Sequence, residues 1–379
     1  MNFELTEEQA MLRNMVKEFA DEVIAPRAGE IDRTGEFPVD IVKKLAELDL
    51  LGLPFPEKYG GAGGDTVSYA IAVEEISRAC ASTGITYAAH ISLGCSPFYL
   101  FGTEEQKQKY LVPLAKGEYM GAFGLTEPNA GSDAGGTQTH AVQDGDEWVI
   151  NGSKIFITNA GYAGTVVITA VTDKSKGTCG ITNFIIPRGT PGFTVGKEFD
   201  KMGLRGSNTV PLYFDNVRVP KENILGTPGQ GFKQFLEVLD GGRISIGAMS
   251  LGIAQACLDA SLQYARERKQ FGQSISKFQA IQFKLADMAM HIELARLMIW
   301  KAAWLKDNKK NFSKEAAYAK LFASEIAAKA ATEAVQIHGG YGYMKEYPVE
   351  RFYRDVKLCE IGEGTSEVQR IVIARLLGC

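Results

Sequence analysis

Residues 273–338 read QSISKFQAIQFKLADMAMHIELARLMIWKAAWLKDNKKNFSKEAAYAKLFASEIAAKAATEAVQIH, a stretch of 66 residues with neither proline nor glycine. Both residues are disfavoured in helix interiors, so a stretch of this length without them predicts long helices. A helix is predicted from Ser313, a capping residue, to a stop at Gly339. Before it, apolar side chains recur at helical spacing in one stripe, at Ile281, Leu285, Met288, Ile292, Ala295 and Ile299. The C-terminal part is therefore predicted to be a bundle of four or five helices.

The N-terminal part, residues 1–120, is also predicted to be mostly helical. Thr6, followed by two glutamates, is typical of the cap of a first helix. The segments VDIVKKLAELDLLG (39–52) and YAIAVEEISRAC (69–80) place apolar residues at helical spacing. Twelve of the 13 prolines precede residue 229, which separates the interrupted part of the chain from the long helices.

The middle of the chain has a different composition. Residues 121–225 contain 16 of the 41 glycines, between short runs rich in β-branched and aromatic residues. These runs are EWVING (147–152), TVVITAV (165–171), NFIIP (183–187), GFTV (192–195) and VPLYFDNVRV (210–219). Short strands separated by turn residues predict a small all-β domain between the two helical parts.

Charge and composition argue against several classes of protein. The 379 residues include 41 basic and 45 acidic side chains, a net charge of −4, whereas nucleic-acid and anionic-membrane binding depend on a basic excess. No run approaches 18 apolar residues, so we expect no membrane span, and the acidic N-terminal stretch lacks the features of a targeting peptide. Six scattered cysteines and four separated histidines predict reduced thiols, a cytoplasmic location and no metal site.

Five further segments occur in a fixed order along the chain. They are GAFGLTEPNAGSDAGG (121–136), NGSKIFITNAG (151–161), ARERKQFGQSISKFQAIQFKLADM (265–288), QIHGGYGYMKEYPVERFYRDVK (336–357) and EIGEGTSEVQRIVIARLL (360–377). Their order and spacing resemble those of the flavin-dependent acyl-CoA dehydrogenases, over nearly the whole chain. The resemblance implies an α+β multidomain fold. Its parts are an N-terminal helical domain (1–120), a central small β-barrel or sandwich domain (121–228) and a C-terminal four-helix bundle (229–379).

The resemblance also implies an activity. A member of this family uses FAD to dehydrogenate an acyl-CoA, here expected to be short-chain, to the trans-2-enoyl-CoA, and passes electrons to an electron-transferring flavoprotein. The implied role is in β-oxidation of fatty acids, the implied assembly is a homotetramer, and nucleic acid and membrane are not expected partners. A thioester α-proton is a weak acid, so the site needs a desolvated carboxylate of raised pKa and donors for the enolate-like oxygen.

The resemblance assigns the catalytic base to Glu363, in the motif IGEGTSE. Gly364 follows it and allows close approach of the backbone to a substrate. Some relatives carry their base instead on a helix with the pattern LDxER. The corresponding segment here is LDGGR (239–243), with Gly242 at the base position, which favours Glu363. The backbone N–H of Glu363 is implied to polarise the thioester oxygen.

Two groups of residues are implied to bind FAD. The flavin ring is expected to lie against five residues of the first two motifs: Phe123, Leu125, Thr126, Phe156 and Thr158. Gly131 and Ser132 of the first motif are expected to meet the pyrophosphate and the CoA-side ligand. A phenylalanine at 156 keeps the stacking of the tryptophan found in many members. The pyrophosphate and adenosine end is expected to meet, partly across a subunit interface, Arg268, Gln270, Phe271, Gln279, Gln336, Gly339 and Gly340. Thr365 and Glu367 match flavin-phosphate and ribose contacts.

Substrate contacts are implied for four positions: Ser132, Asp240, Arg243 and Gly364. Other polar residues in the motifs have a structural interpretation. Glu127 and Glu350 are expected to form structural pairs, and His338 is expected to be a hydrogen-bonded packing residue. His90 could line the acyl pocket, although a packing role is favoured.

Three alternatives remain open from the sequence. An oxidase of the same fold would use oxygen directly, but such proteins are usually longer. A catalytically idle relative that binds DNA would need a basic surface and would not need Glu363. The acyl group is the third open point: Gly362 stands where many straight-chain members have Tyr, so a branched or cyclic acyl-CoA is an alternative to a straight short chain.

Overall fold

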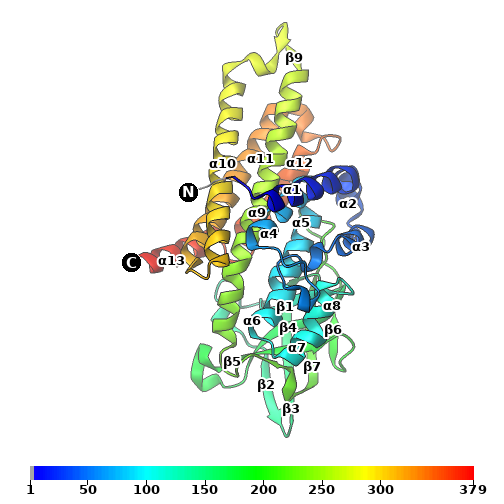
Figure 1. The fold of residues 1–379 in the computed structure, drawn as a ribbon, viewed down its shortest axis with the longest axis vertical. Helices are drawn as coiled ribbons and strands as arrows, with labels where there is room; N and C mark the ends of the chain where they lie inside the picture. The colour runs from blue at the N-terminus through cyan, green and yellow to red at the C-terminus, as the bar shows by residue number, and fades with distance from the viewer. Residues whose placement is uncertain (1–3) are drawn as a thin grey trace.

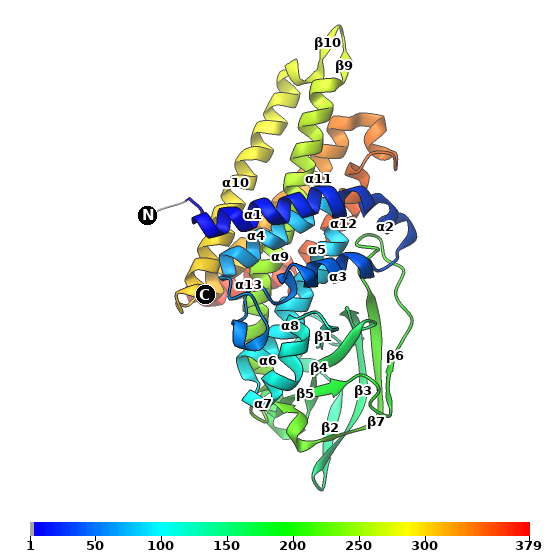
Figure 2. The same cartoon turned by 45° about the vertical axis from the view of Figure 1, so that its right-hand side comes forward.

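A computed structural model describes residues 4–379, which form a helical part, a sheet and a second helical part in that order. Figures 1 and 2 show the sheet at one end of an elongated molecule and the long C-terminal helices running to the other end. The N-terminal helices lie between them and beside the sheet. They are α1 (Glu7–Phe19), α2 (Ala28–Thr34), α3 (Val39–Glu47), α4 (Thr66–Ala79), α5 (Ala81–Ala89), α6 (Ser96–Phe101), α7 (Glu104–Gln106) and α8 (Val112–Ala115).

The first helix begins where the sequence predicts. The Thr6 hydroxyl accepts a hydrogen bond from the backbone N–H of Gln9, and the Gln9 side chain accepts one from the backbone N–H of Thr6. This reciprocal pair satisfies two of the N–H groups that a helix leaves without partners at its start. The predicted cap at Thr6 is confirmed.

The central domain is an eight-stranded sheet in the order β6-β7-β3-β2-β4-β5-β8, with β1 paired in parallel to β4. Five strands cover the runs predicted from the sequence: β3 (Glu147–Thr158), β4 (Ala163–Val171), β5 (Ile181–Pro187), β6 (Phe193–Val195) and β7 (Thr209–Pro220). The sequence did not indicate the other three, β1 (Met120–Gly124), β2 (His140–Asp144) and β8 (Ile224–Leu225). β1 and β2 are short and contain few β-branched or aromatic residues, and β8 has only two residues, so pairing with neighbouring strands decides their conformation.

Five helices make up the C-terminal part. They are α9 (Gly231–Glu267), α10 (Gln279–Asp307), α11 (Ser313–His338), α12 (Val349–Ile361) and α13 (Ser366–Leu377), with a short hairpin of β9 (Lys269–Gln270) and β10 (Gln273–Ser274) between α9 and α10. The predicted extent of the helix from Ser313 to the stop at Gly339 is confirmed, because α11 ends at His338. The predicted capping role of Ser313 is wrong: Phe312 is the N-cap residue, and the Ser313 hydroxyl donates to Asp240 of α9 instead. Five helices is the upper of the two predicted numbers.

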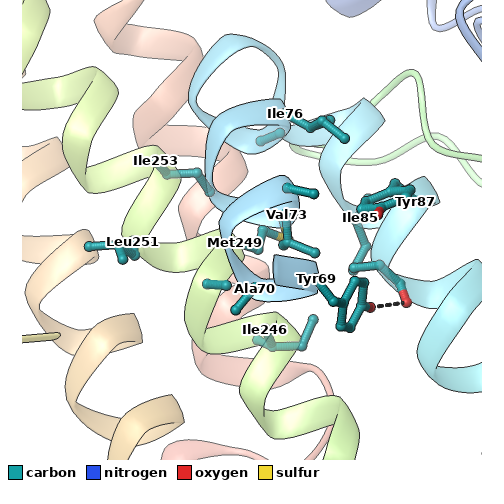
Figure 3. Close-up of a cluster of buried hydrophobic side chains, with 14 of the residues drawn as sticks. Tyr69, Ala70, Val73, Ile76, Ile85, Tyr87, Ile246, Met249, Leu251 and Ile253 are labelled. Atoms are coloured by element: carbon teal, nitrogen blue, oxygen red, sulfur yellow. Dashed lines mark hydrogen bonds between the residues drawn. The ribbon is translucent and has the colours of Figure 1, made fainter. Parts of the chain in front are cut away.

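Helix α9 lies at the centre of the molecule and packs on α4 and α5 of the N-terminal part. Figure 3 shows Ile246, Met249 and Ile253 of α9 facing Ala70 and Val73 of α4 within one buried apolar cluster. At 37 residues, α9 is long and apolar enough to suit a membrane span by composition alone, yet 83% of its most apolar window is buried inside the protein. The packing explains why the middle of the helix, residues 244–254, is buried on all sides.

The sheet has its own apolar cluster, separate from the helical core. It includes Ile150, Ile168, Phe184, Leu212 and Val217, which are buried side chains from β3, β4, β5 and β7. Within residues 4–379, no group of three or more His, Cys, Asp and Glu side chains could hold a metal ion.

Candidate functional site

A turn between α12 and α13, residues 362–365, carries the candidate base. Glu363 has φ +52°, a left-handed conformation that is uncommon outside glycine, and Gly364 has φ +92°. The carboxyl Oε2 of Glu363 is buried and has no hydrogen-bond partner among the residues that the structure describes. No backbone hydrogen bond in residues 4–379 uses the N–H of Glu363 either. Such a buried, unpartnered carboxylate is costly to a fold, which points to a functional role.

The Glu363 carboxyl lies against Gly242 of helix α9. A Cβ built on Gly242 would lie 1.8 Å from Oε2 and 2.8 Å from Cδ of Glu363. Any other residue at 242 would therefore compete for the position of this carboxyl. The structure gives a steric reason why a Glu at 363 and a side chain at 242 exclude one another.

Burial and two cations set the protonation of the base. Desolvation raises the pKa of Glu363 to about 7, and the nearby Lys320 and Arg243 act in the opposite direction by lowering it. A carboxyl group with this pKa is a much stronger base than an exposed glutamate and is still substantially ionised near neutral pH. Reactions that need the carboxylate should therefore slow as the pH falls below about 7.

A buried lysine holds the loop after β1 in place by hydrogen bonds. Lys154 of β3 is fully buried and its Nζ donates to the carbonyl of Leu125 at 3.2 Å and to Oε1 of Glu127 at 2.7 Å. Burial acts to raise the pKa of the Glu127 carboxyl. The Lys154 ammonium outweighs this effect and lowers that pKa to about 2. The backbone N–H of Ile155 donates to the carbonyl of Thr126 at 2.8 Å. Glu127 is thus a structural pair, as predicted, and it fixes the loop that carries Leu125 and Thr126.

The surface above this loop is open and aromatic. Phe156 is 61% exposed and has φ +61°, a rare conformation for a bulky residue. Thr158 ends the same strand, while Gly131 and Ser132 are exposed, with no atom within 4 Å of a Cβ built on Gly131. The hydrogen bond from Ile155 to Thr126 places Leu125 and Thr126 next to the strand that carries Phe156 and Thr158. Phe123 lies beneath them, buried and stacked on Phe235 of α9.

A second group of predicted residues lies at the far end of α9. A cavity of about 470 Å³ is lined by Tyr264, Arg268, Gln270, Ile275, Ile337, His338, Gly339, Gly340, Tyr341 and Met344. Arg268 lies over the ring of Tyr341, 5.3 Å from its centroid, and His338 stacks on Tyr264. His338 also hydrogen-bonds the carbonyl of Ala334 at 2.8 Å, which confirms it as a packing residue. Three further predicted positions, Phe271, Gln279 and Gln336, are exposed but do not line this cavity.

The second group lies far along α9 from the candidate base. Arg268 follows Gly242 by 26 residues along one continuous helix, a span of about 39 Å at the rise of an α-helix. Figure 1 shows the hairpin at β9 at one end of the molecule and strands β1 to β7 at the other. Each chain therefore carries two separate half-sites, one beside Glu363 and one beside Arg268.

Comparison with known protein families decides the identity. Three family models together match most of the chain: the N-terminal (residues 6–118), middle (122–217) and C-terminal (229–378) domains of acyl-CoA dehydrogenase. The chain belongs to the acyl-CoA dehydrogenase family. It is 67% identical to the Bacillus subtilis protein named "Probable acyl-CoA dehydrogenase YngJ", over 100% of both chains.

Solved structures agree with this acyl-CoA dehydrogenase fold. The butyryl-CoA dehydrogenase of Megasphaera elsdenii is 50% identical and superposes with a TM-score of 0.98, covering 100% of both chains. A chain solved in a study of the electron transferring flavoprotein of Acidaminococcus fermentans is 52% identical, with a TM-score of 0.98 over 100% of this chain and 99% of the other. The helical parts and central sheet domain implied by the resemblance are thereby confirmed, whereas the boundaries at 120 and 228 stay predictions.

The cofactor of this family is FAD, and the residues present suit it. An exposed aromatic ring held at positive φ, Phe156, offers a stacking surface, and the open loop at Gly131 and Ser132 offers backbone and hydroxyl donors. The cavity beside Arg268 adds a guanidinium, which suits pyrophosphate oxygens. Phe271 is 94% exposed at φ +52° and directly follows Gln270, which lines the same cavity. These features fit a flavin dinucleotide whose two ends meet different half-sites.

Two predicted substrate contacts, Arg243 and Asp240, pair with one another, and the predicted FAD contact Thr365 also has a partner within the chain. Arg243 pairs with Asp240 on α9, and Asp240 also accepts a hydrogen bond from Ser313 of α11, while Nε of Arg243 is buried without a partner. The Thr365 hydroxyl caps α13 by accepting the N–H of Val368 at 3.2 Å, and Glu367 is exposed in the first turn. Their roles toward CoA and FAD remain predictions.

The structure supports the packing role that the sequence favours for His90. His90 is fully buried, its Nδ1 accepts the N–H of Gly121 at 3.2 Å, and its Nε2 contacts the carbonyl of Leu114 at 3.0 Å. Burial lowers the pKa of His90 to about 4, so the ring is neutral at pH 7. With both nitrogens engaged, His90 packs the helices against β1 and offers no free group to an acyl pocket.

Sequence reasoning missed two residues beside the base. Lys320 of α11 is fully buried and donates to the carbonyl of Gly364 at 2.7 Å. Gln369 of α13, also buried, donates to the carbonyls of Glu363 at 3.1 Å and Gly364 at 3.0 Å. The one signal in the sequence was that Lys320 lies on the same helical face as Ala316 and Ala323, which are both buried.

Proposed function

We propose that this acyl-CoA dehydrogenase oxidises a short-chain acyl-CoA to the trans-2-enoyl-CoA with Glu363 as the base. The observation that carries the proposal is the buried, unpartnered Oε2 of Glu363, with a raised pKa, seated against the bare backbone of Gly242. The butyryl-CoA dehydrogenase named above acts, by its name, on a four-carbon acyl group, and its 50% identity supports a short-chain substrate.

The side chains of this protein have three tasks in the reaction. Glu363 takes the α-proton, and its own N–H, which has no partner in residues 4–379, is available to the thioester oxygen where negative charge develops. Oε2 of Glu363 is buried away from solvent, which strengthens both interactions. FAD, when bound, supplies the acceptor for the hydride that leaves the β-carbon. Leu125, Thr126, Phe156 and Thr158 are assigned to holding its ring in place.

Assembly follows from the separation of the half-sites. Because Arg268 lies about 39 Å along α9 from Gly242, against which the Glu363 carboxyl packs, we infer that a neighbouring chain supplies the cavity beside Arg268. Closed symmetric assemblies are the common outcome of such interfaces, and a homotetramer built as a dimer of dimers satisfies this need. An electron-transferring flavoprotein is the proposed acceptor, supported by the similarity to the chain from the Acidaminococcus study. A cytoplasmic location is part of the same proposal.

Anaerobic reduction of bound FAD tests the function directly. The purified protein is mixed with butyryl-, isobutyryl-, isovaleryl-, glutaryl-, cyclohexanecarbonyl- and octanoyl-CoA without oxygen, and flavin absorbance is followed. We expect rapid bleaching by butyryl-CoA, and then reoxidation by an electron-transferring flavoprotein that is much faster than by oxygen. Fast reoxidation by oxygen would instead indicate an oxidase, and no bleaching by any thioester would indicate an idle relative.

A branched or cyclic substrate is the second candidate, favoured by Gly362. This residue has φ −70° and ψ 153°, so the backbone does not require glycine. A Cβ built there would meet nothing closer than the carbonyl oxygen of Leu358 at 3.5 Å, so no clash requires glycine either. The bare position leaves volume one residue before the base, which suits added groups near the reacting carbons.

Gly362→Tyr should therefore change selectivity more than activity. We expect the ratio of kcat/KM for isobutyryl- or cyclohexanecarbonyl-CoA to that for butyryl-CoA to fall by about 10-fold or more, since small changes in pocket volume are worth about 1–3 kcal/mol. Steady-state kinetics of the parent and variant measure the ratio. An unchanged ratio would mean that position 362 does not shape the acyl pocket.

The proposed assembly makes a further prediction. Sedimentation velocity of the FAD-loaded protein should show a species of four chains, and Arg268→Ala should lower the affinity for FAD because the guanidinium partner of the pyrophosphate is lost. Arg266→Ala, in the last turn of α9 outside the cavity lining, is the control that should retain FAD. An active, FAD-saturated monomer would contradict the shared site.

A further inference from the structure

Two lysines are fully buried in the described part of the chain, Lys154 and Lys320, and their surroundings differ. Lys154 has a carboxylate partner, Glu127, at 2.7 Å. Lys320 has no carboxylate within ion-pair distance among residues 4–379, and its Nζ donates to the carbonyl of Gly364 at 2.7 Å. A buried ammonium without a counter-ion is expensive for a fold, so its presence beside the base turn needs an explanation.

The turn that Lys320 contacts is one that needs support. Glu363 is held at φ +52°, and residues in this region persist only where the surroundings determine them. Lys320 from α11 and Gln369 from α13 together give three hydrogen bonds to the carbonyls of Glu363 and Gly364. These bonds fix both peptide planes that flank Gly364, and so they fix the direction in which the Glu363 side chain leaves the turn.

Lys320 also lies within electrostatic reach of the carboxyl. Its charge lowers the pKa of Glu363, as does that of Arg243 on α9, against the effect of burial. The other titratable groups that face this pair are Tyr69 of α4, and Cys359 and Glu360 of α12. Burial lowers the pKa of Lys320 itself to about 8, so the ammonium form is present at neutral pH.

We propose that Lys320 is a positioning residue for the catalytic base: its ammonium holds the Gly364 carbonyl in place and supplies the buried positive charge that keeps Glu363 ionised. The inference rests on the proposed function of Glu363. It explains why a lysine is buried here at all, because a neutral donor would hold the carbonyl but would not favour the carboxylate.

Three substitutions separate the hydrogen bond that Lys320 donates to Gly364 from the effect of its positive charge on Glu363. Lys320→Met removes the donor and the charge, Lys320→Gln keeps a donor without the charge, and Lys320→Arg keeps both. For butyryl-CoA, we expect the acidic limb of kcat/KM against pH to move upward by about one unit in the Met and Gln variants, because loss of a nearby cation raises the pKa of a carboxyl. The rate on the high-pH plateau should fall about 10-fold in the Met variant and less in the Gln variant. The Arg variant should keep the parental limb.

A second readout does not depend on turnover. Infrared pH titration of the FAD-loaded protein follows the C=O stretch of the protonated carboxyl, with Glu363→Gln identifying the band. In the Lys320→Met and Lys320→Gln variants, we expect the midpoint of this infrared titration to move to higher pH, as the kinetic limb does. Lys329→Met, an exposed lysine on the same helix, is the matched control and should leave the profile and band unchanged.

The outcomes distinguish the possibilities. An unchanged pH limb and unchanged infrared titration in Lys320→Met, or in Lys320→Gln if the Met variant does not fold, would overturn the role of Lys320. Failure of the parent protein to oxidise any acyl-CoA would overturn the proposed function, and the infrared titration would still decide whether Lys320 controls the carboxyl.

Discussion

Glu363→Gln is expected to bind FAD as the parent does and to lose acyl-CoA oxidation by roughly 10²- to 10⁴-fold. The amide has the shape of the carboxyl group but cannot accept the α-proton. Because Oε2 has no hydrogen-bond partner in residues 4–379, its replacement breaks no contact of the fold. The thermal stability of the variant at pH 7 should therefore equal or exceed that of the parent.

Anaerobic stopped-flow reduction by butyryl-CoA measures this loss, and flavin absorbance of the purified variant measures cofactor content. Glu360→Gln is the matched control, since Glu360 lies one turn earlier on α12 and pairs with Lys357. It should reduce its flavin at nearly the parental rate. If Glu363→Gln also reduced its flavin at nearly that rate, the base would lie elsewhere.

Gly242→Ala should inactivate the enzyme without unfolding it. The new Cβ would lie 1.8 Å from Oε2 of Glu363, so the carboxyl has to leave its position. The end of a flexible side chain moves easily, and alanine is favoured over glycine in a helix by roughly 0.5–1 kcal/mol, so stability should be maintained or rise. A displacement of about 1 Å in a reacting group can cost about 10²-fold in rate, which is the expected loss in kcat.

The neighbouring glycine provides the control for this effect. A Cβ on Gly241 would meet only Nζ of Lys306, at 3.3 Å, so Gly241→Ala should give the same helix stabilisation and keep the parental kcat. Thermal unfolding and turnover with butyryl-CoA are measured on both variants. Parental activity in Gly242→Ala would show that the contact with α9 does not position the base.

Much of the fold could be predicted because its signals are local. The long helices follow from 66 residues without proline or glycine, and α11 begins at Ser313 and stops before Gly339 as the sequence indicates. Strand β1 was missed because MGAFG has little strand character, and it forms because it pairs with β4, more than 40 residues away. Pairing across such a distance leaves no mark on the residues of β1 themselves.

The site could be predicted only in part, for a related reason. Motifs located Glu363, and the absence of a side chain at Gly242 supported that choice. Lys320 gave no comparable signal, since a lysine among alanines in a helix is usually solvent-exposed, and only the helical register places it on the buried side. The role proposed for Lys320 depends on its hydrogen bond to the carbonyl of Gly364, and this carbonyl comes close to Lys320 only after α12 and α13 fold back on α11.

The contact between Glu363 and Gly242 also restricts how such an enzyme can change over generations. A lineage that moved its base from the turn to α9 would need a glutamate at 242, and the first atom of that side chain already occupies the space of the Glu363 carboxyl. Gaining the new base first would displace the old one, and losing the old base first would leave none. Each single substitution therefore gives an enzyme of low activity, and the residues at 242 and 363 are expected to change together. An exchange of the base between these positions requires two simultaneous substitutions, or a duplicated gene whose second copy keeps the activity.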